Sequence, residues 1–252
     1  MSKQIDSNSN AVKVAIVTGA SRGIGAAIAK RLAADGFAVI VNYAGREADA
    51  VAVVEQIQAQ GGRAAALQAD VAVPAQVAAL FDQTTHLFGG VDILVNNAGI
   101  MNLSPIADTD DAGFERQIAV NLKGSFNTLR EASKRLRNGG RIVNFSSSVV
   151  GLLQPGYGVY AATKAGVEAM TSILAKELRG RNITVNAVAP GPTATDLFLT
   201  GKPQEVVDRL AKLAPLERLG QPGDIADVVA FLAGPDAAWI NGQVLRANGG
   251  II

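Results

Sequence analysis

A tyrosine, a lysine and a serine are spaced in this sequence so that they could move a proton together. Tyr160 and Lys164 are four residues apart, and Ser147 lies thirteen residues before the tyrosine. On a helix, residues i and i+4 share one face. A nearby positive charge lowers the pKa of a tyrosine from about 10, so that it can exchange protons near neutrality. A surface tyrosine lying over a lysine stem is the competing interpretation, and residues elsewhere in the chain must decide.

The composition restricts the classes of protein to which the chain can belong. Of 252 residues, 48% are hydrophobic and 18% charged, which suits one open α/β sheet with a sizeable core. The net charge is +1 without a basic block, so we expect no nucleic-acid partner and no membrane partner. The chain has no cysteine and a single histidine, His86, so we expect no metal site.

The first ten residues, MSKQIDSNSN, are polar and contain no apolar segment. We therefore predict a disordered N-terminal tail over residues 1–10 rather than a signal peptide. No apolar run in the chain reaches membrane-spanning length. A cytoplasmic location is the resulting expectation.

Short aliphatic runs alternate with longer helical patterns along most of the chain. The predicted strands cover residues 12–17, 38–42, 64–69, 91–95, 141–145, 184–188 and 243–246. The predicted helices cover residues 24–35, 47–60, 75–88, 111–136, 157–178, 204–213 and 222–232. Near-continuous aliphatic strands indicate a sheet buried on both faces.

This alternation predicts one α/β domain over residues 11–252. We expect a Rossmann-type, doubly wound parallel sheet of about seven strands, with helices on both faces. Right-handed crossovers place the ligand crevice beyond the carboxyl ends of the strands. Residues 192–215, rich in Pro, Thr and Gly, interrupt the pattern and are predicted to form a substrate lid containing a short helix.

A glycine-rich turn follows the first predicted strand and leads directly into a helix. Its glycines follow the pattern G-x-x-x-G-x-G. Glycines let the backbone approach a diphosphate closely, and the helix N-terminus offers free N–H groups to it. The competing interpretation is a turn needed only for packing. The residues that we predict to bind a cofactor here are Gly19, Ser21, Arg22, Gly23, Ile24 and Gly25.

The second predicted strand ends at Asn42 and Tyr43, without the acidic residue that would bind adenosine ribose hydroxyls. Arg22 in the glycine turn and Arg46 just past the strand are cations where a ribose phosphate would lie. Guanidinium groups match phosphate well. We therefore predict NADP(H), with NADPH preferred over NADH. The alternative is that both arginines are merely solvated.

Two further strand ends supply candidate cofactor contacts. Asp70 and Val71 close the third strand, where the aspartate could bind the adenine amino group or could instead cap the next helix. Asn97, Ala98 and Gly99 follow the fourth strand. They could form only a turn, or a flat wall against which a cofactor ribose lies.

The order and spacing of these motifs, together with Asn121 and the Pro190-Gly191 pair, resemble the short-chain dehydrogenase/reductase family. The resemblance runs from about Val12 to the C-terminus, and within the family the chain looks most like 3-oxoacyl-[acyl-carrier-protein] reductases and related ketone reductases. Membership implies that Tyr160 transfers a proton to or from the substrate oxygen and that Ser147 binds this oxygen. It also implies that Lys164 lowers the tyrosine pKa and binds the nicotinamide ribose.

The resemblance implies further roles around this centre. Asn121 would hold a water that links the lysine to solvent, whereas a polar residue bonded within its own helix is the competing interpretation. Pro190, Gly191, Thr193 and Thr195 would contact the nicotinamide carboxamide, with a threonine at position 193 where the family usually has an aliphatic residue. The nicotinamide would deliver the hydride, while the protein would align the substrate with the cofactor.

Three consecutive serines make the choice of catalytic serine ambiguous. The thirteen-residue spacing selects Ser147, and Ser148 is the second choice after it, with Ser146 the third member of the run. Strand-end hydroxyls that only bond nearby backbone groups are the competing interpretation for all of them.

The expected substrate pocket is mostly apolar, lined by Met101 and by residues 152–157 and 197–199. This composition suits a small hydrophobic ketone or an acyl thioester. A dehydrogenase of another alcohol, sugar or steroid, a non-catalytic NADP-binding regulator and a methyltransferase of related fold are the alternatives. Small residues on the helices at 111–136 and 157–178, and an apolar C-terminus, favour a homotetramer or homodimer.

Overall fold

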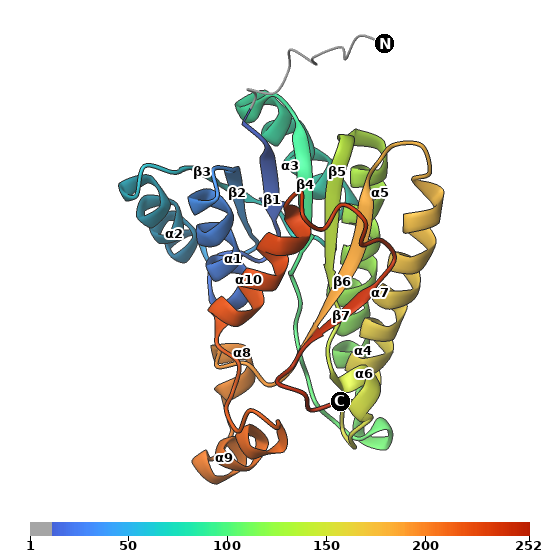
Figure 1. Ribbon diagram of the computed structural model, residues 1–252. Helices are drawn as coiled ribbons and strands as arrows, with labels where there is room; N and C mark the ends of the chain where they lie inside the picture. The colour runs from blue at the N-terminus through green and yellow to red at the C-terminus, as the bar shows by residue number, and fades with distance from the viewer. Residues whose placement is uncertain (1–11) are drawn as a thin grey trace.

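A seven-stranded parallel sheet forms the centre of the molecule in the computed structural model, which describes residues 12–252 (Figure 1). The strand order is β3-β2-β1-β4-β5-β6-β7, and each neighbouring pair is parallel. The strands are β1 (Val14–Val17), β2 (Ala38–Tyr43), β3 (Arg63–Gln68), β4 (Val91–Asn96), β5 (Leu136–Phe145), β6 (Thr184–Pro190) and β7 (Val244–Ala247). The predicted doubly wound fold is confirmed, whereas the tail predicted at residues 1–10 lies outside the described residues.

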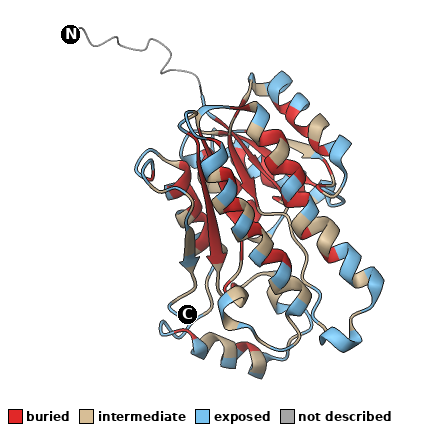
Figure 2. Cartoon of the chain, turned by 90° about the vertical axis from the view of Figure 1, so that its right-hand side faces the viewer, coloured by how far each residue is buried: buried red, intermediate tan, exposed pale blue. Residues whose placement is uncertain are grey.

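Helices cover both faces of the sheet and bury their apolar sides against it. One face carries α1 (Gly23–Ala34), α2 (Glu47–Ala59) and α10 (Pro222–Ala233). The other face carries α3 (Pro74–Phe88), α5 (Gly124–Arg135) and α7 (Gly158–Glu177). Figure 2 shows that buried residues concentrate in the strands and on the sheet-facing sides of these helices.

Alternation along the strands explains how one sheet supports two cores. Ala15 and Val17 of β1 face the cluster formed with α1, α2 and α10, whereas Ile16 between them faces the cluster with α3, α5 and α7. All four residues of β1 are buried, as in a sheet covered on both faces. Each buried aliphatic side chain of this size contributes about 1.5–3 kcal/mol to folding.

The strand order reverses between β1 and β4, and this reversal fixes where a ligand can bind. From β1 the chain continues outward to β2 and β3, and then returns to the other side of β1 with β4. Crossover connections must diverge at such a point, which opens a crevice beyond the carboxyl ends of the two strands. The glycine turn after β1 and the Asn97–Gly99 segment after β4 both lie at this edge.

The predicted long helix at residues 111–136 is interrupted in the structure. It consists of α4 (Asp111–Gln117), a π-helical turn (Ile118–Lys123) and α5. The residue that ends the predicted helix, Leu136, instead begins β5, which is twice as long as expected and has an irregular register against β4. A π turn carries one additional residue per turn, a feature that helix propensity does not encode and that is frequent at functional sites.

The segment predicted as a lid, residues 192–215, contains two helices rather than one. These are α8 (Asp196–Leu199) and α9 (Gln204–Leu213), which lie beyond the carboxyl ends of the strands (Figure 1). Two short elements were not predicted, a 3-10 turn (Ile106–Asp108) and α6 (Val149–Leu152). Between residues 12 and 252, no helix has the length and apolar character needed to cross a membrane.

Candidate active site

A continuous crevice runs along the carboxyl edge of the sheet and consists of two connected parts. The first part, here called the glycine-turn groove, extends from the turn after β1 to Ala44, Asp70 and Arg116. The second part, the tyrosine cavity, contains Tyr160 and Ser147. Five residues line both parts and therefore join them: Ile24, Asn97, Gly99, Thr195 and Leu197.

Close packing explains the glycines of the turn. Gly19 has a φ of +61°, and a Cβ there would come within 2.9 Å of the Ala98 Cα atom. A Cβ on Gly25 would lie 2.4 Å from the Gly19 carbonyl oxygen and 2.5 Å from the Asn97 side chain. The packing interpretation therefore applies to these two glycines, and it leaves the backbone of the turn facing the groove.

Thr18 and Asn97 fasten the glycine turn to the end of β4. The Asn97 Nδ2 atom donates to the Thr18 and Gly19 carbonyl oxygens at 2.9 and 3.0 Å. The Thr18 Oγ1 atom accepts from the backbone N–H groups of Asn97 and Ala98 at 3.0 Å. The Asn97 side chain thus holds the glycine turn against the end of β4 and so fixes this wall of the groove.

Most residues expected to bind a cofactor line the glycine-turn groove. Those that do so are Gly19, Ser21, Arg22, Gly23, Ile24, Gly25, Asn42, Asp70, Val71, Asn97, Ala98, Gly99 and Thr195. Pro190, Gly191 and Thr193 line the tyrosine cavity instead. Tyr43 lies in neither set, because its side chain is buried in the core beside α2, and the next residue, Ala44, lines the groove.

The side chains of Asn42 and Asp70 already have partners in the protein. Asn42 is buried and donates to the carbonyl oxygens of Leu67 and Ala69, at 3.2 and 3.1 Å, so it holds the ends of β2 and β3 together. The Asp70 Oδ1 atom accepts from the Ala72 N–H at 2.9 Å, which forms a local turn, whereas the N-cap of α3 is Val73 and not the Asp70 considered as the alternative.

The two arginines near the second strand differ in their surroundings. Arg22 lines the groove and forms an ion pair with Asp196 of α8, at 3.3 Å between Nη1 and Oδ2. Arg46 pairs with Asp49 on α2 and is not among the groove residues. The structure therefore places only Arg22 of these two in the groove.

Sequence reasoning missed Arg116 and Val120, which also line the groove. They are four residues apart at the junction of α4 and the π turn, so they share one side of the helix. Because Asn121 next to them was already a candidate, this spacing was a usable signal. Asp196 was missed as well, since nothing in its local sequence indicates contact with Arg22.

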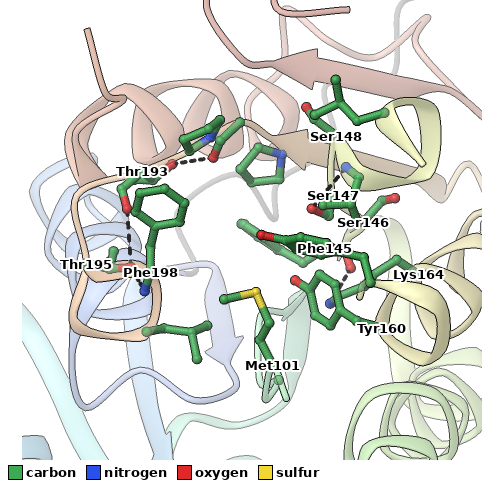
Figure 3. A pocket seen from close by; sticks show the side chains of 18 of the residues that line it. Met101, Phe145, Ser146, Ser147, Ser148, Tyr160, Lys164, Thr193, Thr195 and Phe198 are labelled. Atoms are coloured by element: carbon green, nitrogen blue, oxygen red, sulfur yellow. Dashed lines mark hydrogen bonds between the residues drawn. The ribbon is translucent and has the colours of Figure 1, made fainter. Parts of the chain in front are cut away.

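The helix α7 presents Tyr160 and Lys164 to the tyrosine cavity. Figure 3 shows Tyr160, Lys164 and Ser147 on one side of this cavity and Thr193, Thr195 and Phe198 on the other. The Lys164 Nζ atom donates to the Phe145 carbonyl oxygen at 2.9 Å and lies 5.6 Å from the centre of the Tyr160 ring. Tyr160 and Lys164 thus face one cavity, as their spacing predicts.

The electrostatic state of this pair differs from the expectation. Burial raises the pKa of Tyr160 to about 12, and the Ser147 side chain opposes this shift by hydrogen bonding. Burial also lowers the pKa of Lys164 to about 8. Burial of the phenol is the largest cause of the shift of the Tyr160 pKa, and it acts against the lowering that the spacing to Lys164 predicts.

The three serines after β5 have separate environments. Ser146 is buried, and its Oγ atom donates to the Glu168 carboxylate at 2.5 Å. Ser148 is buried, donates to the Ala189 carbonyl oxygen at 3.3 Å and accepts from the Asn248 side chain at 3.0 Å. Ser147 is half-buried, lines the tyrosine cavity beside Tyr160 and accepts a long 3.4 Å bond from the Val149 N–H. Its hydroxyl is thus the one best placed to bind a ligand.

Asn121 lies within the π turn and is fully buried. Its side chain accepts from the Ile100 N–H at 2.8 Å and donates to the Ile100 carbonyl oxygen at 2.9 Å. It also donates to the Thr163 hydroxyl at 3.3 Å, one residue before Lys164. The side chain therefore connects the strand-end segment after β4 with α7, rather than bonding its own helix.

The segment after β6 bends under the cavity and leads into α8. The Thr193 hydroxyl donates to the Gly191 carbonyl oxygen at 2.9 Å. The Thr195 hydroxyl caps α8 by accepting from the Phe198 N–H at 3.3 Å. Both threonine side chains therefore stabilise the loop that lines this side of the cavity.

The rest of the cavity wall is mainly apolar and comes partly from the lid segment. Of the residues expected there, the wall contains Met101, Leu152, Gln154, Tyr157, Leu197 and Phe198 and lacks Leu153, Pro155, Gly156 and Leu199. The apolar residues that line it from residues 192–215 are Pro192, Leu197, Phe198, Leu210 and Leu213. No group of three or more potential metal ligands of the His, Cys, Asp or Glu type occurs in residues 12–252.

Comparison with known proteins places this geometry in a family. The family model described as Enoyl-(Acyl carrier protein) reductase matches residues 19–252. A short-chain type dehydrogenase/reductase of Picea abies is 49% identical over 94% of this chain and 92% of its own. An NADPH-dependent aldehyde reductase-like chloroplastic protein of Arabidopsis thaliana is 46% identical, covering 95% of this chain and 94% of its own.

Two further matches agree with these. The 3-oxoacyl-[acyl-carrier-protein] reductase of Staphylococcus aureus is 44% identical over 95% of this chain and 98% of its own. A solved short-chain dehydrogenase of Burkholderia cenocepacia J2315, in complex with NADP, is 41% identical over 95% of this chain and 97% of its own, with a TM-score of 0.90. The fold, the match over most of the chain and these identities show that this chain belongs to the short-chain dehydrogenase/reductase family.

Proposed function

We propose that this protein reduces a carbonyl group with NADPH, with Tyr160 as the proton donor. The substrate that we propose is a 3-oxoacyl thioester or a similar hydrophobic ketone. The observation that carries the proposal is the convergence of Tyr160, Ser147 and Lys164 in one cavity that opens into the glycine-turn groove. As a member of this family, the chain is an oxidoreductase. Its relatives include reductases named for aldehydes and for 3-oxoacyl groups.

The protonation state of Tyr160 favours the direction of reduction. A phenol with a pKa of about 12 is protonated at neutral pH, so it can donate a proton to a carbonyl oxygen as negative charge develops there. Ser147 would donate a second hydrogen bond to the same oxygen and fix its position. In the direction of oxidation the phenol would have to lose its proton first, at a higher energetic cost.

Lys164 and Asn121 support this centre. Lys164 is buried, its Nζ atom is held at the Phe145 carbonyl oxygen, and this atom lies 3.6 Å from where a Cβ on Gly99, a residue shared by the cavity and the groove, would stand. We propose that it binds the ribose hydroxyls of the cofactor. Asn121 fixes the segment after β4 and lies one hydrogen bond from the residue preceding Lys164, so we propose that it keeps the lysine and its proton path aligned.

The groove residues fit NADP(H), which supplies the hydride when it is bound. The α1 helix begins at Gly23 without a side-chain cap, so its first backbone N–H groups are free for a diphosphate. Arg22 lies where a ribose phosphate can pair with its guanidinium group. The solved relative from Burkholderia cenocepacia binds NADP, in agreement with this assignment.

We also propose that residues 192–215 close over the substrate within the single domain 12–252. This segment supplies Phe198, Leu210 and Leu213 to the cavity wall, opposite Tyr160. An apolar wall of this kind excludes water from the reacting oxygen and suits an acyl chain or an apolar ring.

A homodimer or homotetramer in the cytoplasm completes the proposal. Helices α5 and α7 expose Phe126 and Ile173 at 49% and 55%, and Trp239 after α10 is 99% exposed. Apolar side chains of this size at the surface are typical of subunit contacts. Light scattering at micromolar concentration tests the assembly, since a monomer contradicts it, and cell fractionation tests the location.

The function is tested by following NADPH oxidation with a panel of carbonyl compounds. The panel comprises a β-ketoacyl thioester, a β-keto ester, an aryl ketone, an aliphatic aldehyde, an α,β-unsaturated thioester and a free sugar. We expect turnover with the apolar carbonyl compounds and its loss, by about 100-fold or more, in Tyr160→Phe. Turnover that persists in Tyr160→Phe, or that occurs only with the unsaturated thioester, contradicts the proposal.

A further inference from the structure

The tyrosine cavity contains a second phenol and an amide that the proposed reaction does not use. Tyr157 and Gln154 lie on the segment between α6 and α7, and both line the cavity together with Ser147 and Tyr160. Tyr157 occupies the N-cap position of α7, three residues before Tyr160. The same helix therefore fixes the backbone of both tyrosines. The Tyr157 phenol is close enough to Tyr160 to raise the pKa of that group.

The hydrogen bonds of this segment come from its backbone. The Tyr157 N–H donates to the Gln154 carbonyl oxygen at 3.3 Å, and the Tyr157 carbonyl accepts from the Ala161 N–H at 2.8 Å. Within residues 12–252, neither the Tyr157 hydroxyl nor the Gln154 side-chain amide has a hydrogen-bond partner in the protein. Both side chains are half-buried, and burial raises the pKa of Tyr157, so its hydroxyl stays protonated and can donate.

A substrate with a single oxygen leaves these groups unpaired. In the proposed reaction its carbonyl oxygen would be held by Tyr160 and Ser147, and its carbon atoms would lie against the apolar wall formed by Met101 and the lid segment. When the lid excludes water, an unpaired Tyr157 hydroxyl costs free energy, whereas an acceptor on the substrate avoids that cost. The cavity therefore has one polar corner with more donors than one carbonyl oxygen requires.

We infer that Tyr157, with Gln154 beside it, is a specificity-determining residue that hydrogen-bonds a second oxygen of the substrate. The preferred substrates then carry a carbonyl or hydroxyl oxygen one or two carbons from the reacting carbonyl, with an apolar chain or ring beyond it. This inference rests on the proposed reduction at Tyr160 and narrows its substrate class.

The test compares the loss caused by Tyr157→Phe across four substrates of similar length. These are 2,3-hexanedione, ethyl 3-oxohexanoate, 2-hexanone and hexanal, each assayed by NADPH oxidation. The measured quantity is the ratio of kcat/KM between wild type and variant for each substrate, which cancels differences in intrinsic reactivity. Leu153→Ala is the matched control, because Leu153 lies in the same segment with its side chain 73% exposed and is not part of the cavity wall.

We expect Tyr157→Phe to lower kcat/KM by about tenfold for one or both dioxygenated substrates and by less than about twofold for 2-hexanone and hexanal. A loss confined to the diketone identifies a vicinal second oxygen, and a loss confined to the ester identifies one two carbons away. An equal loss for all four substrates indicates a structural role, and no loss for any indicates no role. Either of these results overturns the inference.

Failure of the inference is distinguishable from failure of the proposed function. If wild type reduces these compounds and Tyr160→Phe does not, the function holds whatever Tyr157→Phe does. If wild type reduces none of them with NADPH, both statements fall.

Discussion

The Asn121 side chain forms two opposed hydrogen bonds with the backbone of Ile100, one to the carbonyl oxygen at 2.9 Å and one from the N–H at 2.8 Å. The side-chain amide of Asn121 thus pairs with both the N–H and the C=O of Ile100, as a neighbouring strand would do in a sheet. It explains why the π turn is tolerated at this point of the chain, since the turn aims Asn121 at Ile100.

Replacement of Asn121 by leucine should therefore lower both stability and turnover. The change leaves two partly buried backbone groups of Ile100 without their side-chain partner, and each costs up to about 1–3 kcal/mol. Urea unfolding measures this loss, and Asn102→Ala, at an exposed position nearby, is the control with an expected change below about 0.5 kcal/mol. Equal stability of Asn121→Leu and wild type would show that the two bonds contribute nothing.

The two adjacent serines should give opposite results when each is replaced by alanine. Ser147→Ala removes a hydroxyl from the cavity wall and should lower kcat by about 100-fold or more with little effect on stability. Ser148→Ala removes a buried hydroxyl with two partners and should cost about 1–2 kcal/mol of stability with a smaller effect on kcat. A larger loss of turnover in Ser148→Ala than in Ser147→Ala would show that Ser148 is the serine that acts in the reaction.

The affinity for NADPH should depend on pH through Lys164. Because its pKa is about 8, the ammonium group is neutralised as the pH rises through this value, and its hydrogen bonds to ribose hydroxyls weaken. We expect kcat/KM for NADPH to be constant below about pH 7 and to fall by up to tenfold per pH unit above about 8. Steady-state assays between pH 6 and roughly 9.5 measure this, and a flat profile across the range contradicts it.

The shifted pKa values of Lys164 and Tyr160 make the free energy of unfolding depend on pH. The pKa of Lys164 is about 8 in the folded protein against an ordinary value of 10.5, so between these values the unfolded chain binds more protons and stability rises with pH. Tyr160 acts in the other direction: between its ordinary pKa of 10.0 and about 12 the folded chain retains the proton that the unfolded chain loses, so stability falls.

Urea unfolding of wild type and Lys164→Met separates the contribution of the lysine. Methionine keeps the length of the side chain without the charge. The free energy of unfolding of wild type relative to the variant should therefore increase from about pH 7.5 to 10, a range that covers most of the interval between the folded and ordinary pKa values of Lys164. A constant difference between the two proteins across this range would show that Lys164 titrates normally.

The preference for NADPH should depend on Arg22 and not on Arg46. Loss of a guanidinium–phosphate contact typically costs about 1.5–3 kcal/mol, so Arg22→Ala should lower the NADPH to NADH ratio of affinities by about tenfold or more. Arg46→Ala is the matched control, since Arg46 pairs with Asp49 outside the groove. The assignment fails if fluorescence titrations give the same ratio for wild type and Arg22→Ala.

Patterns that depend on neighbours in the chain were predictable from the sequence. The aliphatic runs identified every strand and the parallel sheet. Burial on both faces imposes that composition on central strands such as β1 and β2, whereas the edge strands β3 and β7 are only partly buried. The i, i+4 spacing placed Tyr160 and Lys164 on one face of a helix. The glycine pattern predicted the groove, because a tight turn that leads into a helix has few alternative sequences.

Properties that depend on distant contacts were not predictable. The π turn contains Asn121, whose side chain bonds Ile100 in the segment after β4, and helix propensity, which does not include such a distant contact, predicts an uninterrupted helix. Tyr43 was expected in the groove because it ends a strand, but α2 covers it. The raised pKa of Tyr160 follows from burial by elements remote in sequence, whereas the spacing to Lys164 shows only the charge.

If Arg22 selects the cofactor as proposed, its ion pair with Asp196 also connects that selection to the wall of the substrate cavity. Asp196 begins α8, whose neighbours Leu197 and Phe198 form part of the cavity wall, and Thr195 packs against the position of Gly23. An engineer who replaces Arg22 to switch the enzyme to NADH also releases this anchor. Cofactor switching at this position thus carries a side effect on KM for the carbonyl compound, and restoring the anchor elsewhere on α8 becomes part of the redesign.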